Sequence, residues 1–362
     1  MGHWEAFPAA DPVATGIAFA SAVVVTDLEY ISWSGGAGSA LSPACGNENC
    51  QRGFALNLET KVWREIGVAG APFARVYPSA VWTGKEMVVW GGSISQSGAG
   101  LTDGGAYNPT TDTWRTIAND GAPSARRWSR PIWTGKEILF WGGADFTTTA
   151  EQVPVLGDGA AYNPSTDSWR SISTKNAPSP RCSHSAVWTG TEMLVWGGTK
   201  DGGLGLAPSD TLGDAFAYDP ASDSWRSLSV KGGPKPNVGC LEAWTGTEML
   251  VWGGAKGQTM AAYNPASNTW RDIDPSGPHL TYGPCNVWSG QYFVVCGAED
   301  DPEGGALYDP TLDRWYPIPA YPTSEMNDAR AFAYQGDVIT SGGDTPFGFE
   351  DDLNVYRFVT PK

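Results

Sequence analysis

The sequence predicts an all-β fold, a seven-bladed β-propeller made of four-stranded antiparallel blades. Two recurring elements predict it: a tryptophan-led stretch that ends in two glycines, and a following stretch that carries a tyrosine and then a tryptophan. Composition agrees, since 46 glycines, 27 prolines and 18 tryptophans in 362 residues supply many turns and many large aromatic surfaces to bury. A repeat of about 45–55 residues indicates one assembly of small units, so residues 1–362 are expected to form a single domain.

The tryptophan-led element reads as a pair of strands joined by a tight turn. In Trp82-Thr-Gly-Lys-Glu-Met the two-residue turn is Gly84-Lys85, with glycine supplying a positive φ at the first central position. No stretch of 10 residues keeps a helical period, which excludes a helical solenoid. Counting from residues 82–92, further copies occur at residues 133–143, 188–198, 244–254 and 288–298, with weaker ones at 25–35 and 333–343.

The second element supplies the other two strands of each blade. Its clearest form runs from Tyr107 through Asn108-Pro109 to Trp114, and related stretches follow each of the first six tryptophan-led elements. The seventh copy lacks its final tryptophan, but the N-terminus contains Trp4 in a similar setting. We therefore expect residues 3–8 to form the fourth strand of the last blade and to close the ring, which removes an exposed sheet edge.

The double glycine, the tyrosine and the tryptophan after a polar hairpin together resemble the kelch motif over essentially the whole chain, in its bacterial, galactose-oxidase-like form. The resemblance implies four antiparallel strands per blade with the first strand innermost. We interpret the repeated aromatic residues as packing residues rather than as a site. The resemblance implies no single activity, because kelch propellers include adaptors, oxidases, epimerases and lectin-like binders.

Charge and composition exclude several kinds of site. A formal net charge of −16 argues against a nucleic-acid binder, which needs a basic surface. No window approaches the ~20 uninterrupted apolar residues of a membrane helix. A copper site of the galactose oxidase type needs two histidines, and His3, His184 and His279 are scattered; no cysteine and histidine spacing fits zinc. We expect no metal and no cofactor.

The candidate ligand-binding residues lie just before each tryptophan-led element. One aligned position carries Arg75, Arg126 and Arg181 in successive copies. In the kelch adaptors that the chain resembles, arginines at this place line the ligand-facing mouth of the channel, and guanidinium groups suit anions. The alternative is that each arginine bonds to carboxylates or carbonyls of neighbouring blades. The remaining candidates are Tyr77, Arg127, Trp128, Arg130, His184, Asn237, Tyr282, Asn327 and Arg330.

Three functions compete at this point. The leading hypothesis is a non-catalytic, monomeric binding propeller that recognises a glycan or a protein segment at the channel mouth, where long insertions at 37–51, 93–104, 144–158 and 199–214 favour one working side. The first alternative is a polysaccharide lyase or sugar epimerase, in which His184 or Tyr282 moves a proton while Arg126 and Arg181 neutralise a uronate, with Glu242 as a further catalytic candidate. The second alternative is a structural adaptor.

The six cysteines and the N-terminal residues indicate where in or outside the cell the protein is found. Residues 1–3 resemble an expression remnant ahead of a mature start, so we expect a secreted or periplasmic protein whose signal peptide has been removed. In the sixth blade a turn at 290–291 sets Cys285 opposite Cys296, close enough for a disulfide. A bridge would indicate an oxidising compartment, and the alternative is six reduced thiols. Cys45 and Cys50 are a second candidate pair, whereas Cys182 and Cys240 should not face each other.

Overall fold

The regular structure of the described residues consists of β-strands alone. A computed structural model describes residues 2–6, 22–33, 51–95, 98–145, 153–202, 210–236, 238–252, 260–274, 276–277, 285–296, 305–319, 330–341, 344–345, 348–349 and 353–358. These residues divide into two compact units, Met1–Ile66 with Ile273–Lys362, and Gly67–Asp272. The expectation of a single domain stays a prediction.

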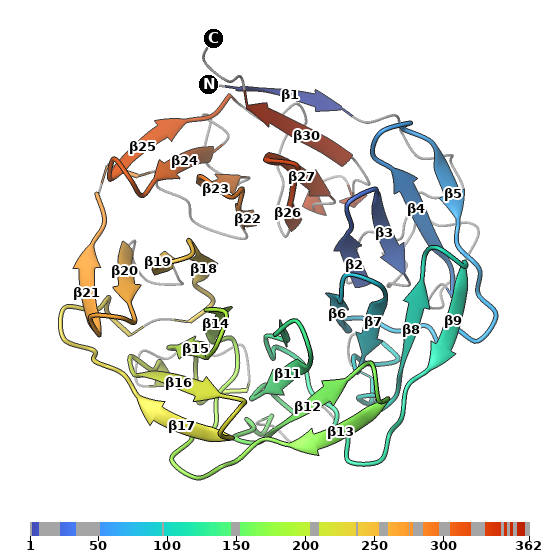
Figure 1. The fold of residues 1–362 in the computed structure, drawn as a ribbon, viewed down its shortest axis with the longest axis horizontal. Coiled ribbons are helices and arrows are strands. Elements are labelled where there is room, and N and C mark those ends of the chain that lie inside the picture. The colour runs from blue at the N-terminus through green and yellow to red at the C-terminus, as the bar shows by residue number, and fades with distance from the viewer. Residues whose placement is uncertain are drawn as a thin grey trace. The chain divides into compact units, whose positions relative to one another are not determined.

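The unit Gly67–Asp272 contains four blades, each a four-stranded antiparallel sheet in sequence order (Figure 1). The second blade comprises β6 (Ser79–Trp82), β7 (Met87–Trp90), β8 (Gly104–Asn108) and β9 (Thr113–Thr116). The third comprises β10 (Ile132–Trp133), β11 (Ile138–Trp141), β12 (Gly159–Asn163) and β13 (Ser168–Ser171). The fourth comprises β14 (Ser185–Trp188), β15 (Met193–Trp196), β16 (Ala215–Asp219) and β17 (Ser224–Ser227). The fifth comprises β18 (Leu241–Trp244), β19 (Met249–Trp252), β20 (Met260–Asn264) and β21 (Thr269–Asp272).

The other unit contains the first, sixth and seventh blades. The first blade comprises β2 (Ala22–Val25), β3 (Glu29–Trp33), β4 (Gly53–Asn57) and β5 (Trp63–Glu65). The sixth comprises β22 (Cys285–Trp288), β23 (Phe293–Cys296), β24 (Gly305–Asp309) and β25 (Arg314–Pro317). The seventh has the order β26 (Arg330–Tyr334), β27 (Asp337–Ser341), β30 (Leu353–Phe358) and β1 (Gly2–Ala6), and a separate hairpin joins β28 (Asp344–Thr345) to β29 (Gly348–Phe349).

Seven blades of four antiparallel strands make the chain an all-β, seven-bladed β-propeller, as the sequence predicts. The N-terminal strand completes the seventh blade: β1 pairs with β30 and sets Trp4 opposite Tyr356. Trp114 lies opposite Tyr107 in the same way in the second blade. The prediction for Trp4 is therefore confirmed in its register, and residues 7 and 8 lie outside the described residues.

The first hairpin has the predicted turn in the second to sixth blades, where the first central residue is a glycine with positive φ. Thr83 donates its N–H to the carbonyl of Glu86 at 3.0 Å, so Gly84 and Lys85 are the central pair. Gly84 has a φ of +85°, and a Cβ built on it would meet nothing within 4 Å. Glycine is thus needed here for its backbone conformation alone, since side chains with a Cβ rarely adopt positive φ.

A repeated clamp binds each blade from the second to the sixth to the segment that precedes it. In the fourth blade the Asp223 carboxylate accepts hydrogen bonds from the Tyr218 hydroxyl at 2.6 Å and from the backbone N–H of Ser173 at 2.9 Å. The Trp225 indole donates to the carbonyl of the same Ser173 at 2.8 Å. Both backbone groups of one residue are therefore satisfied by the next blade, which explains the spacing of aspartate and tryptophan. The corresponding pairs are Asp112 with Trp114, Asp167 with Trp169, Asn268 with Trp270 and Asp313 with Trp315.

In the first blade an ion pair takes the place of this hydrogen-bonded clamp. Lys61 occupies the left-handed position that aspartate takes elsewhere, and its ammonium group pairs with Glu5 of β1. Glu5 also accepts from the Arg357 guanidinium at 2.7 Å. The hydrogen bonds from Arg357 and Lys61 lower the pKa of Glu5 from 4.5 to about 2. The N-terminal strand is thus held by ion pairs as well as by its backbone ladder.

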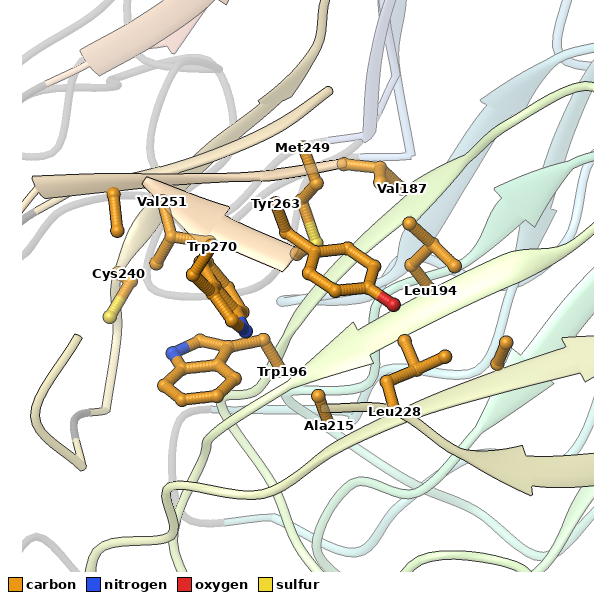
Figure 2. Packing of buried hydrophobic residues seen from close by; sticks show 12 residues of the cluster. Val187, Leu194, Trp196, Ala215, Leu228, Cys240, Met249, Val251, Tyr263 and Trp270 are labelled. Atoms are coloured by element: carbon orange, nitrogen blue, oxygen red, sulfur yellow. The ribbon is translucent and has the colours of Figure 1, made fainter. Parts of the chain in front are cut away.

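The core lies between neighbouring blades and is built from the repeated aromatic residues. In the cluster between the fourth and fifth blades, Trp196 and Trp270 pack with their ring centroids 4.8 Å apart (Figure 2). Tyr263 is 1 % exposed, and Leu194 and Met249 belong to the same apolar cluster. This confirms that the repeated tyrosines and tryptophans are packing residues.

The cysteine predictions are settled only in part. Cys285 lies directly opposite Cys296, as predicted. Their side chains lie outside the described atoms, as do residues 45 and 50, so neither bridge is tested. Cys182 and Cys240 are buried as thiols, and burial raises their pKa values to about 11 and about 12. The expectation that these two do not pair is confirmed.

Candidate functional site

Two kinds of connection meet on one face of the second, third and fourth blades. The linkers that precede the first strands pair with the loops between the second and third strands through the bridges Val76 to Ser93, Arg127 to Ala144 and Cys182 to Thr199. We call this surface the linker face; it comprises linker residues 73–78, 124–131 and 179–184 and loop residues 91–95, 142–145 and 197–202. The sequence predicted one working side, and these loops belong to the long insertions that suggested it.

The three aligned arginines are structural parts of this face. The side chains of Arg75, Arg126 and Arg181 are completely buried. Each donates to the carbonyl of the first glycine of the double-glycine pair in its own blade, at 2.9 Å in every case. Each also pairs with an aspartate at the end of its loop; these are Asp103, Asp158 and Asp214.

Arg126 and Arg181 have all five of their guanidinium N–H donors engaged. For Arg126 the acceptors are the carbonyls of Ser124, Gly142 and Asp158, the Ser124 hydroxyl and the Asp158 carboxylate. No donor of these two guanidinium groups is left to point at a ligand, which does not favour the anion-binding role expected of them. They are also unsuited to neutralise a uronate in an enzyme. Their guanidinium groups instead connect the linker to the loop of the same blade through hydrogen bonds.

Tyr77 and Trp128 are the aromatic candidates on the linker face. Both are half-buried, and both have left-handed backbones, with φ of 54° and 57°. The same position in the next two linkers holds Ser183, with φ of 52°, and Gly239, with φ of 65°. A bulky residue in this conformation costs about 1–2 kcal/mol, so the two aromatics are held where glycine would suit the backbone better.

Arg127 supports Tyr77 from the next linker. Its guanidinium carbon lies 5.4 Å from the centre of the Tyr77 ring. The same group donates to the Ser93 hydroxyl and to the Ser95 carbonyl, the latter at 3.1 Å. Arg127 is 5 % exposed, and burial lowers its pKa from the ordinary value. It therefore orients Tyr77 and the loop of the second blade rather than facing solvent.

A polar cluster lies where the first strands of the third, fourth and fifth blades begin. Arg130, just before β10, places its Nε 3.4 Å from Oε1 of Glu242 on β18. The Glu242 side chain is 12 % exposed and that of Arg130 is 49 % exposed. Burial raises the pKa of Glu242, while Arg130 and the neighbouring Ser185 hydroxyl act in the opposite direction.

His184 is buried in the same cluster. It is 1 % exposed, and its ring meets the Trp141 ring edge-on with centroids 5.4 Å apart. Neither Nδ1 nor Nε2 has a hydrogen-bond partner among the described residues. Burial lowers the pKa of His184 to about 3, helped by the positive charges of Arg181 and Arg130. The imidazole is therefore neutral at pH 7 and is a weak base, which does not favour the proton-abstracting role proposed for it.

The structure brings together only some of the predicted site residues. Tyr77, Arg127, Trp128, Arg130, His184 and Glu242 lie within the unit Gly67–Asp272, whereas Arg330 begins β26 in the other unit. Asn237, Tyr282 and Asn327 lie outside the described residues. Sequence reasoning missed Ser129 and Ser185, whose buried hydroxyls belong to the polar cluster. A position-by-position comparison of the blades could have found such residues. A residue that differs from its equivalents in the other blades is one that the fold does not require.

Two further findings concern the described part of the chain. It holds no group of three or more histidine, cysteine, aspartate or glutamate residues that could bind a metal ion. Among the same residues, no helix has the length and apolar character needed to cross a membrane.

Comparisons with known proteins agree with this architecture. The family model described as "KLHDC2/KLHL20/DRC7 Kelch-repeats domain" matches residues 2–198 and residues 132–343. Adagio-like protein 3 of Oryza sativa subsp. japonica is 30% identical over 200 residues, which are 51% of this chain and 30% of that protein. Adagio protein 3 of Arabidopsis thaliana is 28% identical over 229 residues, 57% of this chain and 35% of that protein.

Kelch domain-containing protein 3 of Homo sapiens is 26% identical over 214 residues, 57% of this chain and 54% of that protein. The matches thus span between about a third and about a half of these relatives' own lengths. Because the family model covers most of the sequence, from residue 2 to residue 343, and the blades carry the repeated glycines, tyrosines and tryptophans in place, this chain belongs to the kelch-repeat family.

Proposed function

We propose that this kelch propeller is a non-catalytic binding module whose linker face recognises a segment of a partner protein. Kelch membership supports a binding or adaptor role at this coarser level. The observation that carries the finer proposal is the pair Tyr77 and Trp128. Both residues are half-buried and have a left-handed backbone conformation that would suit glycine better. Large aromatic residues often anchor protein interfaces.

Exposed apolar groups on the same connections support this choice. Phe73 is 62 % exposed in the linker of the second blade, and Ile94 is 46 % exposed in the paired loop. A glycan, which also stacks on aromatic rings, is the competing ligand in the same binding class. The lyase or epimerase alternative is not favoured, because Arg126 and Arg181 are engaged in the fold and His184 is a weak base.

Replacing Trp128 or Tyr77 with glycine should weaken binding strongly and leave the fold intact. Gly239 already occupies this position in the fifth blade, and relief of the left-handed strain offsets the contacts that are lost. Peptides selected from a displayed random library against the unaltered protein should bind either variant about thirtyfold more weakly, the scale of an interface hot spot. Fluorescence anisotropy measures this, and circular dichroism checks the fold.

The matched control is Tyr316→Ala. Arg314 stacks over Tyr316 at 5.3 Å, much as Arg127 stacks over Tyr77, but Tyr316 lies on β25 in the other unit. Its loss should leave peptide affinity unchanged. If selection yields no peptides while a glycan array yields ligands that depend on Tyr77 and Trp128, the face binds glycans instead.

A secreted or periplasmic location remains part of the proposal and rests on the cysteines. Thiol titration of the denatured, unreduced protein should find fewer than the six thiols that the sequence contains, because each disulfide removes two. The opposed register of Cys285 and Cys296 is the reason for this expectation. The same sample after reduction should show all six, and six before reduction would remove the argument for export.

A further inference from the structure

Glu242 is a buried carboxylate that the fold does not need. It stands on β18, two residues before the repeated tryptophan Trp244. The residues at the same position in the other six blades are Val23, Ala80, Pro131, Ala186, Asn286 and Ala331. None of these is ionisable, and three of them are alanine. The other blades pack with uncharged residues at this position, so packing of the blade does not require a glutamate here. Burying a carboxylate is costly, which suggests that Glu242 has another role.

Arg130 is the cation that faces Glu242. Its equivalents are Ser79 in the second blade, Ser185 in the fourth and Arg330 in the seventh. Pro131 lacks an N–H, and β10 accordingly has two residues where β6, β14 and β18 have four. Arg130 therefore lies ahead of the strand, with about half of its side chain exposed.

The Arg130–Glu242 pair is looser than the repeated ion pairs that join a fourth strand to the first hairpin turn of its blade. It measures 3.4 Å from Nε to Oε1. The pairs between a fourth strand and the first hairpin turn measure 2.7 Å for Arg115 with Glu86, 2.7 Å for Arg170 with Glu137, 2.6 Å for Arg226 with Glu192 and 2.8 Å for Arg271 with Glu248. Those pairs recur from blade to blade and belong to the sheet. Among the described residues the Arg130–Glu242 pair has no counterpart in another blade. It joins a half-exposed guanidinium to a nearly buried carboxylate, and a half-exposed partner is readily exchanged.

The surroundings of Glu242 suit a second guanidinium or ammonium group. The Ser185 hydroxyl lies beside its carboxylate. Arg130, which faces Glu242, also lies close enough to His184 to influence its titration, and the neutral His184 ring has two nitrogens without a partner among the described residues. The buried Ser129 hydroxyl, one residue before Arg130, is likewise without such a partner. These groups offer acceptors to a planar, multidentate cation.

We propose that Glu242 receives an arginine or lysine side chain of the bound protein segment, and that Arg130 holds this place in the unliganded protein and leaves it on binding. The inference rests on the proposed function and names its partner more closely: a basic segment. The overall formal charge of −16 agrees, because an acidic protein attracts a basic segment from a distance.

The experiment uses the peptides selected for the proposed function. We expect them to be enriched in arginine or lysine. Resynthesis of one arginine-containing peptide with citrulline, its neutral counterpart, should weaken binding to the unaltered protein by about tenfold, since a charge-assisted pair is lost. Against Glu242→Ala the two peptides should bind equally. Against Arg130→Ser the arginine peptide should bind about threefold more tightly, because its competitor is gone.

Both variants introduce residues that the repeat already uses at these positions, alanine as at Ala80 and serine as at Ser79, so both should fold. Peptides that bind without any preference for a cation, or that bind Arg130→Ser more weakly, would overturn this inference and leave the proposed function standing. A screen that yields no protein-segment binder would overturn both. Equal effects of citrulline on the unaltered protein and on Glu242→Ala would place the cation elsewhere.

Discussion

Replacing Arg126 with alanine should destabilise the protein by about 2–5 kcal/mol, because its fully buried guanidinium satisfies two backbone carbonyls and each buried acceptor left without a donor costs about 1–3 kcal/mol. The substitution would leave the carbonyls of Gly142 and Asp158 and the carboxylate of Asp158 without the donor that now satisfies them. These groups join the linker before the third blade to the loop after β11, so both connections should loosen. Urea unfolding followed by tryptophan fluorescence measures the change in free energy of unfolding.

Arg226→Ala is the matched control for Arg126→Ala. Arg226 forms a two-point pair with Glu192, but its side chain is 47% exposed. An exposed pair contributes about 0–1 kcal/mol, so this variant should be nearly as stable as the unaltered protein. If Arg126→Ala unfolded no more easily than Arg226→Ala, the burial of the guanidinium would be structurally unimportant, and an anion-binding role for it would return.

His184 should make the protein acid-sensitive between pH 6.5 and pH 3. Its pKa is lowered from the ordinary 6.5 to about 3, chiefly because burial disfavours the charged imidazolium. In this range the unfolded chain binds the proton and the folded protein does not, so the free energy of unfolding falls as the pH falls. The loss is about 1.4 kcal/mol per pH unit, or about 2–3 kcal/mol between pH 6.5 and pH 4.5.

The variant His184→Ser isolates this contribution, because Ser129 occupies the equivalent position in the third blade. At pH 7 the variant should be the less stable protein, since it loses the contact with Trp141. Acidification to pH 4.5 should then narrow the difference between the two free energies of unfolding by about 2–3 kcal/mol, because only the unaltered protein loses the contribution of His184. Carboxylates titrate alike in both proteins and cancel in the comparison. Parallel stability curves for the two proteins over this range would show that the imidazole is not held neutral by the fold.

The repeat made most of the architecture predictable. Hairpin turns, strand register and the place of Trp4 opposite Tyr356 follow from local spacing, because a two-residue turn and the period of two determine which residues face each other. The first glycine of the double-glycine pair permits close approach of the next linker, because a Cβ on Gly142 would lie 2.8 Å from the carbonyl of Arg181. The clamp of Asp223 and Trp225 on Ser173 could not be predicted, since its two halves are about 50 residues apart in sequence.

The linkers that carry the candidate residues could be found from the sequence, but the contacts of those residues could not. Alignment of the copies singled out Arg75, Arg126, Trp128 and His184 in these linkers. Whether a guanidinium meets solvent or carbonyls depends on how far the loop folds back over the linker, which is a long-range contact that no local pattern encodes.

By itself, then, the sequence determined the all-β propeller class, the number of blades and the residues that pack between them, because these follow from turn chemistry and a repeated burial pattern. Only the tertiary structure decided that Arg126 connects linker and loop by hydrogen bonds, that His184 is neutral and that Arg130 faces Glu242. Those outcomes depend on burial and on partners supplied by different blades, and desolvation acts on a charge only once the blades have assembled.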